Sequence, residues 1–503
     1  MYLLYHPYSM GLTLISLVAT AFMIFSKKKE NRILSVIILL ISIFPIFNFV
    51  LNGFLYINGK SLIPFIPLVL INTADFLELI FSKLNKKIKI VLIAYIMISA
   101  SIVCFKCNLS EDLITPDTIE DSFYQSYSDD TLYRTNTSLI DKTYINKVRS
   151  PSEYKTTMYS STFNKNYYDA YNDLFYNPKP NRNKFYMNSS NNILFQMYMG
   201  EKYIISREEY PNDMYQKVFS KDDIFVYQND YVLPIGYATT RNINIKDFED
   251  LSYPENVVNM LGNSVTSDET NIELIKIDNV KPSYTLHEKQ NIEYTKIAED
   301  GYLVEALENA RITLEMDIEL KNKLLFIGFD LEEQTYDLSI QINDVKNKLT
   351  SKNARYKNGH TYFNFILFDN LLNIQFDKGE YMIHHINISV IDFDYLKNVK
   401  NNVDHFIIDK DRTKGDSIVG KIDVKEENSY FVISIPYDKG FSILVDGKKM
   451  NYQKVNKAFI GFKITKGNHD IEITYHAPYQ KMGEILSLTG IIFLLILCGF
   501  KEN

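Results

Sequence analysis

The sequence predicts a multi-pass α-helical membrane protein with a large extracytoplasmic region that combines an α/β domain with β-sandwiches. The first hundred residues and the last twenty are strongly apolar, whereas the stretch between them is rich in Asn, Lys, Asp and Tyr. From about residue 265 the apolar residues alternate with polar ones, which is typical of half-buried strands. A chain of 503 residues is also too long for one compact core. We therefore expect a membrane anchor and several aqueous domains.

Membrane helices are predicted where an apolar run approaches the roughly 20 residues needed to cross a bilayer. Basic residues cluster between the first and second runs and between the third and fourth, which places those loops in the cytoplasm and residues 108–480 outside. The first run lacks a basic region before it, so we interpret it as a span and not as a signal peptide. Further helices are expected upstream of it. The five predicted spans are 10–26, 33–51, 62–81, 90–107 and 483–500.

The predicted domains follow these changes of pattern. Residues 311–320, RITLEMDIEL, place apolar side chains on one face of a strand. Two hairpins turn at Lys378-Gly379 and Asp446-Gly447, and such strands close naturally into sandwiches. The predicted divisions are four transmembrane helices in 1–107, a mixed α/β domain in 108–255, a jelly-roll-like β-sandwich in 256–400, a second β-sandwich module in 401–480 and a C-terminal transmembrane helix in 483–500.

Composition and motifs disfavour several function classes. A net charge of −7 without a basic stripe argues against nucleic-acid binding. The cysteines Cys104, Cys107 and Cys498 all lie in or beside apolar runs, so the aqueous part is predicted to lack disulfides and thiolate metal sites. The scattered histidines are interpreted as structural rather than metal-binding, and the Asp-rich loop 407–416 as a solvated loop rather than a calcium site. No phosphate-binding loop, nucleophile elbow or dinucleotide fingerprint occurs. No cofactor is evident, and the catalytic residue is unknown.

Polar residues in the third predicted span are candidate functional residues. Asn72, Asp75 and Glu78 recur every third residue and so share one helix face. An ionisable group inside a membrane is a functional hypothesis by default. The alternative is that Glu78 reaches the interface near Lys83 while Asp75 meets a neighbouring helix.

The turn NGFLYINGKS, residues 52–61, is the second candidate site. Asn52, Asn58 and Lys60 combine amide donors with a cation at the predicted outer edge of the membrane. Such a set suits the phosphate of a lipid headgroup. The alternative is an ordinary polar turn.

Several segments together resemble the YfhO family of bacterial multi-pass membrane proteins. They are NGFLYINGKSLIPF, YMGEKYIISREEYP followed by VYQNDYVLPIGYA, and IPYDKGFSILVDGKKMNYQKVNKAFIGFKITKGNHDIEITY. The resemblance implies a GT-C-type glycosyltransferase that takes a polyprenyl-phosphate sugar as donor and modifies cell-wall polymers such as lipoteichoic acid. Lys60 falls where relatives tend to have Arg beside an aromatic residue, and Ser61 replaces that aromatic. No residue here matches the catalytic acid of GT-C enzymes.

Two functions remain open at this point. The first is the C-terminal part of a lipid-linked-sugar-dependent glycosyltransferase at the bacterial plasma membrane, with its catalytic N-terminal helices missing. Its expected partners are polyprenyl phosphate or other membrane lipid, a cell-wall polymer acceptor and possibly an N-terminal half encoded upstream. The rival is a non-enzymatic, membrane-anchored surface protein that binds a glycan or a partner protein through its tandem β-sandwiches.

Overall fold

The protein, seen as a computed structural model, divides into two compact units, Met1–Thr118 and Ile119–Asn503. Each unit is described by itself. The structure describes residues 14–52, 54, 63–108, 129–137, 154–160, 162–181, 186–187, 191–207, 214–221, 224–354, 357–358, 360 and 361–499.

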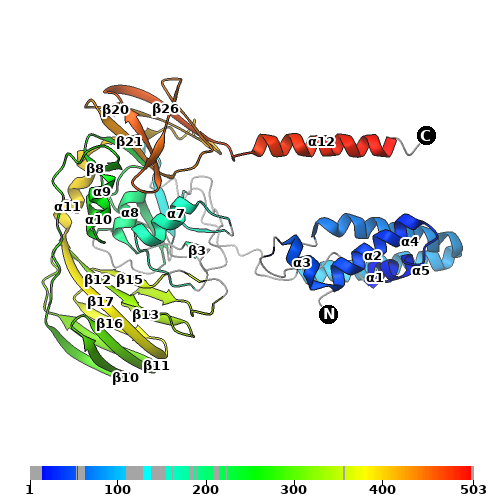
Figure 1. The fold of residues 1–503 in the computed structure, drawn as a ribbon, viewed down its shortest axis with the longest axis horizontal. Helices are drawn as coiled ribbons and strands as arrows, with labels where there is room; N and C mark the ends of the chain where they lie inside the picture. The colour runs from blue at the N-terminus through cyan, green and yellow to red at the C-terminus, as the bar shows by residue number, and fades with distance from the viewer. Residues whose placement is uncertain are drawn as a thin grey trace. The chain divides into compact units, whose positions relative to one another are not determined.

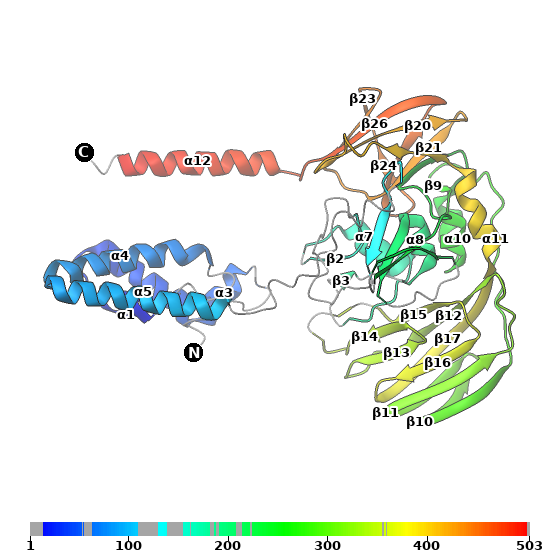
Figure 2. The same ribbon diagram turned by 180° about the vertical axis from the view of Figure 1, so that it is seen from behind.

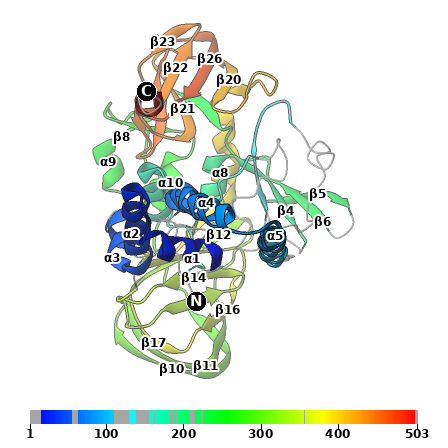
Figure 3. The same ribbon diagram turned by 90° about the vertical axis from the view of Figure 1, so that its right-hand side faces the viewer.

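Helices make up the described part of the first unit (Figure 3). Its two small apolar clusters form where α1, α2 and α4 pack together: Ala19 and Met23 meet Phe76, and Ile38 and Ile41 meet Val69. The helices are α1 Leu14–Met23, α2 Lys29–Ile43, α3 Pro45–Leu51, α4 Ile66–Lys83 and α5 Lys86–Asn108.

The predicted class, a multi-pass helical membrane protein, is wrong. Within the described ranges one helical stretch, Ile63–Lys83, is long and apolar enough to cross a bilayer, and a second arises only if α2 and α3 count as one bent span. The rest of the described chain is mostly β-strand.

Local backbone geometry explains why the length of the apolar runs predicted too many membrane spans. α2 and α3 meet at an angle of 89°, so the run 33–51 is not one straight helix. The break lies at Pro45, whose ring disfavours helical geometry in the residue before it, and Phe44 is extended with φ −92° and ψ 114°. The described part of the run 10–26 is helical over Leu14–Met23, which is about 15 Å long and half the thickness of a hydrocarbon core.

The second unit is built mainly from sheets, shown from two sides in Figures 1 and 2. Its strands before the large sheet are β1 Arg134–Thr137, β2 Met158–Tyr159, β3 Tyr186–Met187, β4 Glu201–Ser206, β5 Gln216–Lys221, β6 Ile224–Gln228, β7 Gly236–Thr239, β8 Asn242–Asn244 and β9 Ser264–Thr266. Its helices are α7 Lys165–Asp169, the π-helix η4 Ala170–Leu174, α8 Ile193–Met199, α9 Ile245–Glu249, α10 Glu255–Met260, α11 Phe393–Asn398, the 3₁₀-helix η5 Val399–Asn402 and α12 Gln480–Gly499.

A mixed layer centres on α8, whose seven residues are all buried. The Asn192 side chain accepts hydrogen bonds from the first turn of α8, and Gly200 ends the helix with φ +67°, a conformation that favours glycine. The chain then enters β4, which is buried along its whole length in the sheet β1-β4-β6-β5. The family segment YMGEKY is thus a helix end followed by a central strand.

An eight-stranded sheet follows, in the order β14-β13-β16-β11-β17-β12-β15 with β10 paired to β11. Strand β11 changes partner midway: its residues 302–306 pair with β17, and its residues 310–315 pair with β16. Asn309 lies at the change with φ +58°, so one strand turns from one half of the sheet into the other. The result is one continuous sheet curled into a near-barrel around a single apolar core, and not the two separate sheets of the predicted sandwich. Its strands are β10 Tyr284–Ala298, β11 Gly301–Met316, β12 Lys323–Leu331, β13 Leu338–Ile342, β14 Val345–Leu349, β15 Tyr362–Leu367, β16 Leu371–Phe376 and β17 Gly379–Asp392.

Two five-stranded sheets, β18-β7-β21-β25-β24 and β19-β20-β26-β22-β23, share the last core. Strand β7 precedes its neighbour β21 by about two hundred residues, so this layer is completed by an earlier part of the chain. The hairpin at Asp446-Gly447 has φ +51° and +74°, the geometry that joins twisted antiparallel strands. The remaining strands are β18 Asp404–His405, β19 Ile407–Ile408, β20 Ser417–Val424, β21 Ser429–Pro436, β22 Phe441–Val445, β23 Lys448–Met450, β24 Gln453–Val455, β25 Phe459–Ile464 and β26 Gly467–Tyr475.

Candidate functional site

A buried amide ties three helices of the first unit together. Asn72 on α4 is fully buried, and its Nδ2 lies 3.1 Å from Ser35 Oγ on α2 and 3.5 Å from Thr20 Oγ1 on α1. Such side-chain hydrogen bonds hold apolar helices in register. Asp75 is half-buried and Glu78 is exposed, so the structure gives the three predicted residues different surroundings. A functional role for Asp75 and Glu78 stays a prediction.

The predicted lipid-phosphate site is described only at Asn52. This residue follows the last turn of α3, and its backbone N–H donates to Asn48 O at 3.1 Å. Asn58 and Lys60 lie outside the described residues. The site therefore stays a prediction.

Three of the segments that carry the family resemblance, all in the second unit, meet at one buried asparagine, Asn456. Its Nδ2 donates to the hydroxyls of Tyr198 at 3.0 Å and Tyr237 at 3.3 Å and to Asn263 O at 3.1 Å. Its Oδ1 accepts from the Val265 N–H at 2.6 Å. Tyr198 comes from YMGEKY, Tyr237 from PIGYA and Asn456 from VNKAF. These residues are far apart in the chain and share one polar network, which indicates a role in specifying the fold.

A second buried network joins β1 and β4 to β21. The Arg134 guanidinium donates to Ser434 Oγ at 2.7 Å, to Ser434 O at 2.8 Å and to Met199 O. Glu201, with no exposed surface, accepts from Asn136 Nδ2 at 3.0 Å and from the Thr156 hydroxyl. Burial raises the pKa of the Glu201 carboxyl from 4.5 to about 7, while those two hydrogen bonds and the nearby Arg134 charge lower it.

Glu201 should make the protein less stable as the pH rises. Between its unfolded pKa of 4.5 and its folded pKa of about 7 the folded state holds the extra proton, so the free energy of unfolding falls as the pH increases through that window. The loss is on the order of 3 kcal/mol for a fully buried carboxyl with such a shift. We expect the denaturation midpoint of Glu201→Gln to change less between pH 5 and pH 8 than that of the unchanged protein.

Asp268 offers a control of opposite sign. The Lys463 ammonium, followed by the Tyr430 hydroxyl, lowers the pKa of the Asp268 carboxyl, so its contribution to stability is lost as the pH falls through that lowered pKa. In Asp268→Asn the free energy of unfolding should still fall between pH 5 and pH 8, as it does in the unchanged protein. An equal loss in Glu201→Gln and in the unchanged protein would exclude Glu201 as its source.

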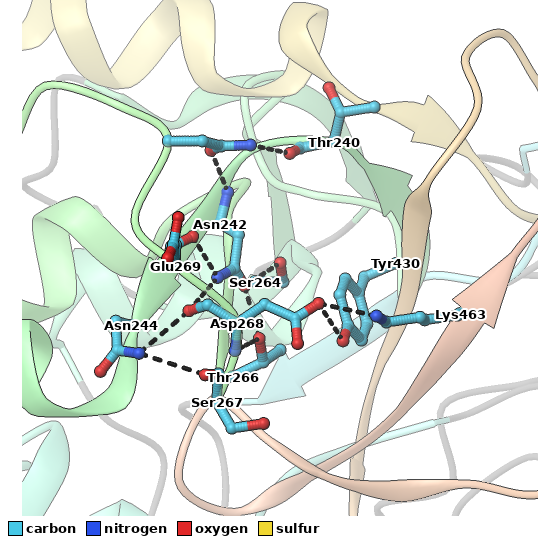
Figure 4. Close-up of polar contacts among 11 residues, drawn as sticks. Thr240, Asn242, Asn244, Ser264, Thr266, Ser267, Asp268, Glu269, Tyr430 and Lys463 are labelled. Atoms are coloured by element: carbon cyan, nitrogen blue, oxygen red, sulfur yellow. Dashed lines mark hydrogen bonds and ion pairs between the residues drawn. The ribbon is translucent and has the colours of Figure 1, made fainter.

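Asp268 lies in the segment that follows β9, and side-chain amides hold this segment in place (Figure 4). Asn242 Nδ2 donates to the carbonyls of Asp268 and Glu269, each at 3.0 Å, and Asn244 Nδ2 donates to Asp268 O at 3.1 Å. The Asp268 carboxylate accepts from Tyr430 OH at 2.9 Å and pairs with Lys463 Nζ at 2.8 Å. These contacts fasten the segment after β9 to β21 and β25, and they engage the carboxylate in structural bonds.

The best candidate for a binding site is an open polar cleft of about 640 Å³ on the eight-stranded sheet. Five of its lining residues form one row across five strands, because each lies directly opposite the next in the strand register. Opposite residues on adjacent strands point to the same face. We call this row the polar ladder; in order it consists of Lys346, Gln341, Gln375, Arg311 and Gln290.

The polar ladder combines cations with amides over a length suited to an extended ligand. Five strands about 4.8 Å apart give a row of about 19 Å. Gln290, Arg311 and Gln375 are exposed, and Gln341 and Lys346 are half-buried. Arg311 Nη2 donates to Glu288 Oε1 at 2.5 Å, which leaves other guanidinium N–H groups for a ligand.

Sequence reasoning missed the polar ladder. The neighbouring residues Ile340, Phe376 and Ala310 are paired in register on the buried face, and the apolar alternation does predict that face. Which outward residues line up depends on the register between strands whose paired residues, such as Arg311 and Gln375, lie far apart in the chain. A periodic pattern in one strand carries no such information.

Metal chemistry finds no support in the described ranges. There, no group of three or more His, Cys, Asp or Glu side chains is placed to hold an ion. Two of the predicted structural histidines pair with single carboxylates: His385 Nδ1 lies 2.9 Å from Asp330 Oδ2, and His469 Nδ1 lies 2.8 Å from Asp446 Oδ2.

The chain matches, over residues 1–487, a family model described as bacterial membrane protein YfhO. It belongs to the YfhO family. The resemblance seen in the sequence is therefore confirmed, and with it an association with the bacterial membrane. Over 180 residues this YfhO-family chain is 26% identical to the uncharacterized protein YfhO of Bacillus subtilis (strain 168), a match that covers 35% of this chain and 21% of the relative. The matched part thus spans about a fifth of the relative's length.

The solved structures compared with this chain resemble it only weakly. A cupin 2 conserved barrel domain protein from Leptotrichia buccalis covers 40% of this chain and 99% of its own at 13% identity, with a TM-score of 0.11. AerE from Microcystis aeruginosa covers 37% of this chain and 98% of its own at 12% identity, with a TM-score of 0.09. Likeness at this level carries no argument about fold or function.

Proposed function

We propose that this YfhO-family chain holds a cell-wall polymer, such as lipoteichoic acid, as the acceptor-binding part of a glycosyltransferase that uses a polyprenyl-phosphate sugar. The polar ladder is the observation that supports it. Cations at Lys346 and Arg311 can pair with anionic groups of a polymer, and the amides of Gln341 and Gln375 between them can bind its hydroxyls. Residues 108–480 would then face the outside of the cell, where such polymers lie.

For the transfer step, the proposal assigns to this chain only contacts to the donor phosphate and the positioning of the acceptor. In the whole enzyme a carboxylate would accept the proton of the acceptor hydroxyl as it attacks the sugar carbon, and the lipid phosphate would leave. Asn52, Asn58 and Lys60 are the proposed contacts to that phosphate, with no base assigned in this chain. The polar ladder would supply position, because holding the acceptor near the donor lowers the entropic part of the barrier.

Polymer binding should depend on the polar ladder. We expect the double variant Arg311→Ala/Gln375→Ala to bind purified lipoteichoic acid roughly tenfold or more weakly, since hydrogen bonds to charged groups contribute about 1.5–3 kcal/mol each. The measurement is titration calorimetry with the full chain in lipid nanodiscs.

Two matched variants test the assignment. Lys321→Ala removes an exposed cation outside the polar ladder and should leave the affinity unchanged. Glu288→Gln frees Arg311 from its ion pair and should keep or raise the affinity. Equal affinity of the double variant and the unchanged protein would refute the proposal for this cleft.

A strain that lacks this gene distinguishes a function in glycosyl transfer from the alternative of a non-enzymatic surface protein. Loss of polymer glycosylation in the deletion strain, with return by the unchanged gene but not by Lys60→Ala, supports a part in transfer. Unchanged glycosylation with intact polymer binding supports the non-enzymatic alternative. Full return by the Lys60→Ala gene would remove Lys60 from the phosphate site.

A further inference from the structure

Aromatic side chains gather where the chain passes from β26 into α12. The rings of Phe441 and Tyr475 lie 4.9 Å apart, and those of Tyr437 and Tyr452 lie 5.7 Å apart. Tyr479, the residue before α12, is 81% exposed. We call these five residues, Tyr437, Phe441, Tyr452, Tyr475 and Tyr479, the aromatic collar.

The backbone of the family segment PYDKGF, residues 436–441, fixes the aromatic collar in place. The His476 N–H donates to Gly440 O at 2.9 Å, and a Cβ at position 440 would lie 2.3 Å from the His476 carbonyl oxygen. Only glycine permits that approach. The Tyr452 hydroxyl donates to Asp438 O at 2.9 Å and lies 3.1 Å from Phe441 O. The segment thus fastens the chain that leads into α12.

Half of the 14 side chains described in the helix that follows, residues 480–493, are large, apolar and exposed. Its 20 residues measure about 30 Å. Two lysines near its beginning are exposed: Lys481 is the second residue of α12, and Lys439 precedes Gly440, whose carbonyl accepts from the His476 N–H. The exposed large apolar side chains of α12 are Met482, Ile485, Leu486, Leu488, Ile491, Ile492 and Phe493.

We propose that the aromatic collar, with Lys439 and Lys481, is a bilayer-interface site that binds the headgroups of anionic phospholipids. Tyrosine has an apolar ring and a polar hydroxyl, so it favours the headgroup layer, and a lysine beside it meets the lipid phosphates. Each basic residue at an anionic surface strengthens the contact by about fivefold. The exposed apolar side chains of α12 would then enter the lipid beyond it. This site is independent of the polar ladder and of any transfer chemistry.

The protein contains no tryptophan, so a single introduced one reports on its own surroundings. Tyr479→Trp in the full chain, in nanodiscs with brominated phosphatidylcholine, should show blue-shifted emission and lose most of its fluorescence. Tyr336→Trp, at a 39% exposed tyrosine before β13, should keep its emission. Unquenched, water-like emission at position 479 would overturn the interface site.

The headgroup preference has its own readout. In the Tyr479→Trp variant, energy transfer from the introduced indole to dansyl-labelled lipid should be stronger with phosphatidylglycerol than with phosphatidylcholine at equal dye content. Adding Lys439→Ala/Lys481→Ala should abolish that difference. Adding Lys448→Ala/Lys449→Ala, at the other end of the same hairpin, should preserve it. A difference that survives the first pair, or is absent from the start, would overturn the anionic-lipid assignment.

Discussion

Replacing Asn456 by leucine is expected to lower the free energy of unfolding of the β-rich unit by about 3–5 kcal/mol, since several buried polar groups lose their partner at once. The Val265 N–H and the Tyr198 hydroxyl lose their bond to Asn456, and the Tyr237 hydroxyl and Asn263 O are left with their bond to each other, at 2.9 Å. Asn456 also has φ +49°, a conformation that asparagine tolerates better than leucine. Urea denaturation followed by circular dichroism in the β-strand region measures the effect.

The same segment provides the control. Asn451 is exposed and five residues earlier, and Asn451→Leu should shift the free energy by less than about 0.5 kcal/mol. Equal midpoints for Asn456→Leu and Asn451→Leu would mean that the shared polar network does not stabilise the fold.

Arg134→Met should destabilise the same unit by roughly 3–5 kcal/mol, because it removes one member of a buried charged network. Met199 O and the Ser434 carbonyl lose their donor, and the Glu201 carboxyl loses a neighbouring positive charge. The pKa of Glu201 should therefore rise further, which extends to higher pH the window over which the unit loses stability. Denaturation midpoints at pH 5, 7 and 9 test both effects.

Arg412→Met is the matched substitution at an exposed arginine. Its guanidinium lies 3.4 Å from Asp470 Oδ2 with both side chains about half exposed, a pair that contributes little. Arg134→Lys keeps the positive charge but lacks the planar guanidinium, so its denaturation midpoint should fall between those of Arg134→Met and Arg412→Met. A midpoint for Arg134→Met no lower than that for Arg412→Met would contradict a stabilising role for the buried network.

The local chemistry of the candidate sites was only partly visible in the sequence. The spacing of polar residues in the run 62–81 predicts a functional face that includes Asn72. The partners of Asn72 lie on two other helices, which no spacing within one helix can identify. Asn456 lies within the family segment but has no feature that separates it from other asparagines of this Asn-rich chain. Burial and four partners distinguish it, and these exist only in the folded protein.

The sequence by itself determined the family, the association with the membrane and the buried faces of strands such as β11, because motif residues and apolar periodicity are local properties. The tertiary structure decided which apolar runs stay straight, since an extended residue before Pro45 breaks one of them. It also decided that β11 belongs to both halves of one curled sheet. Above all it set the register that places Arg311, Gln375 and Gln341 in one row. Register arises from contacts between distant strands, so it is a property of the whole fold and not of any segment.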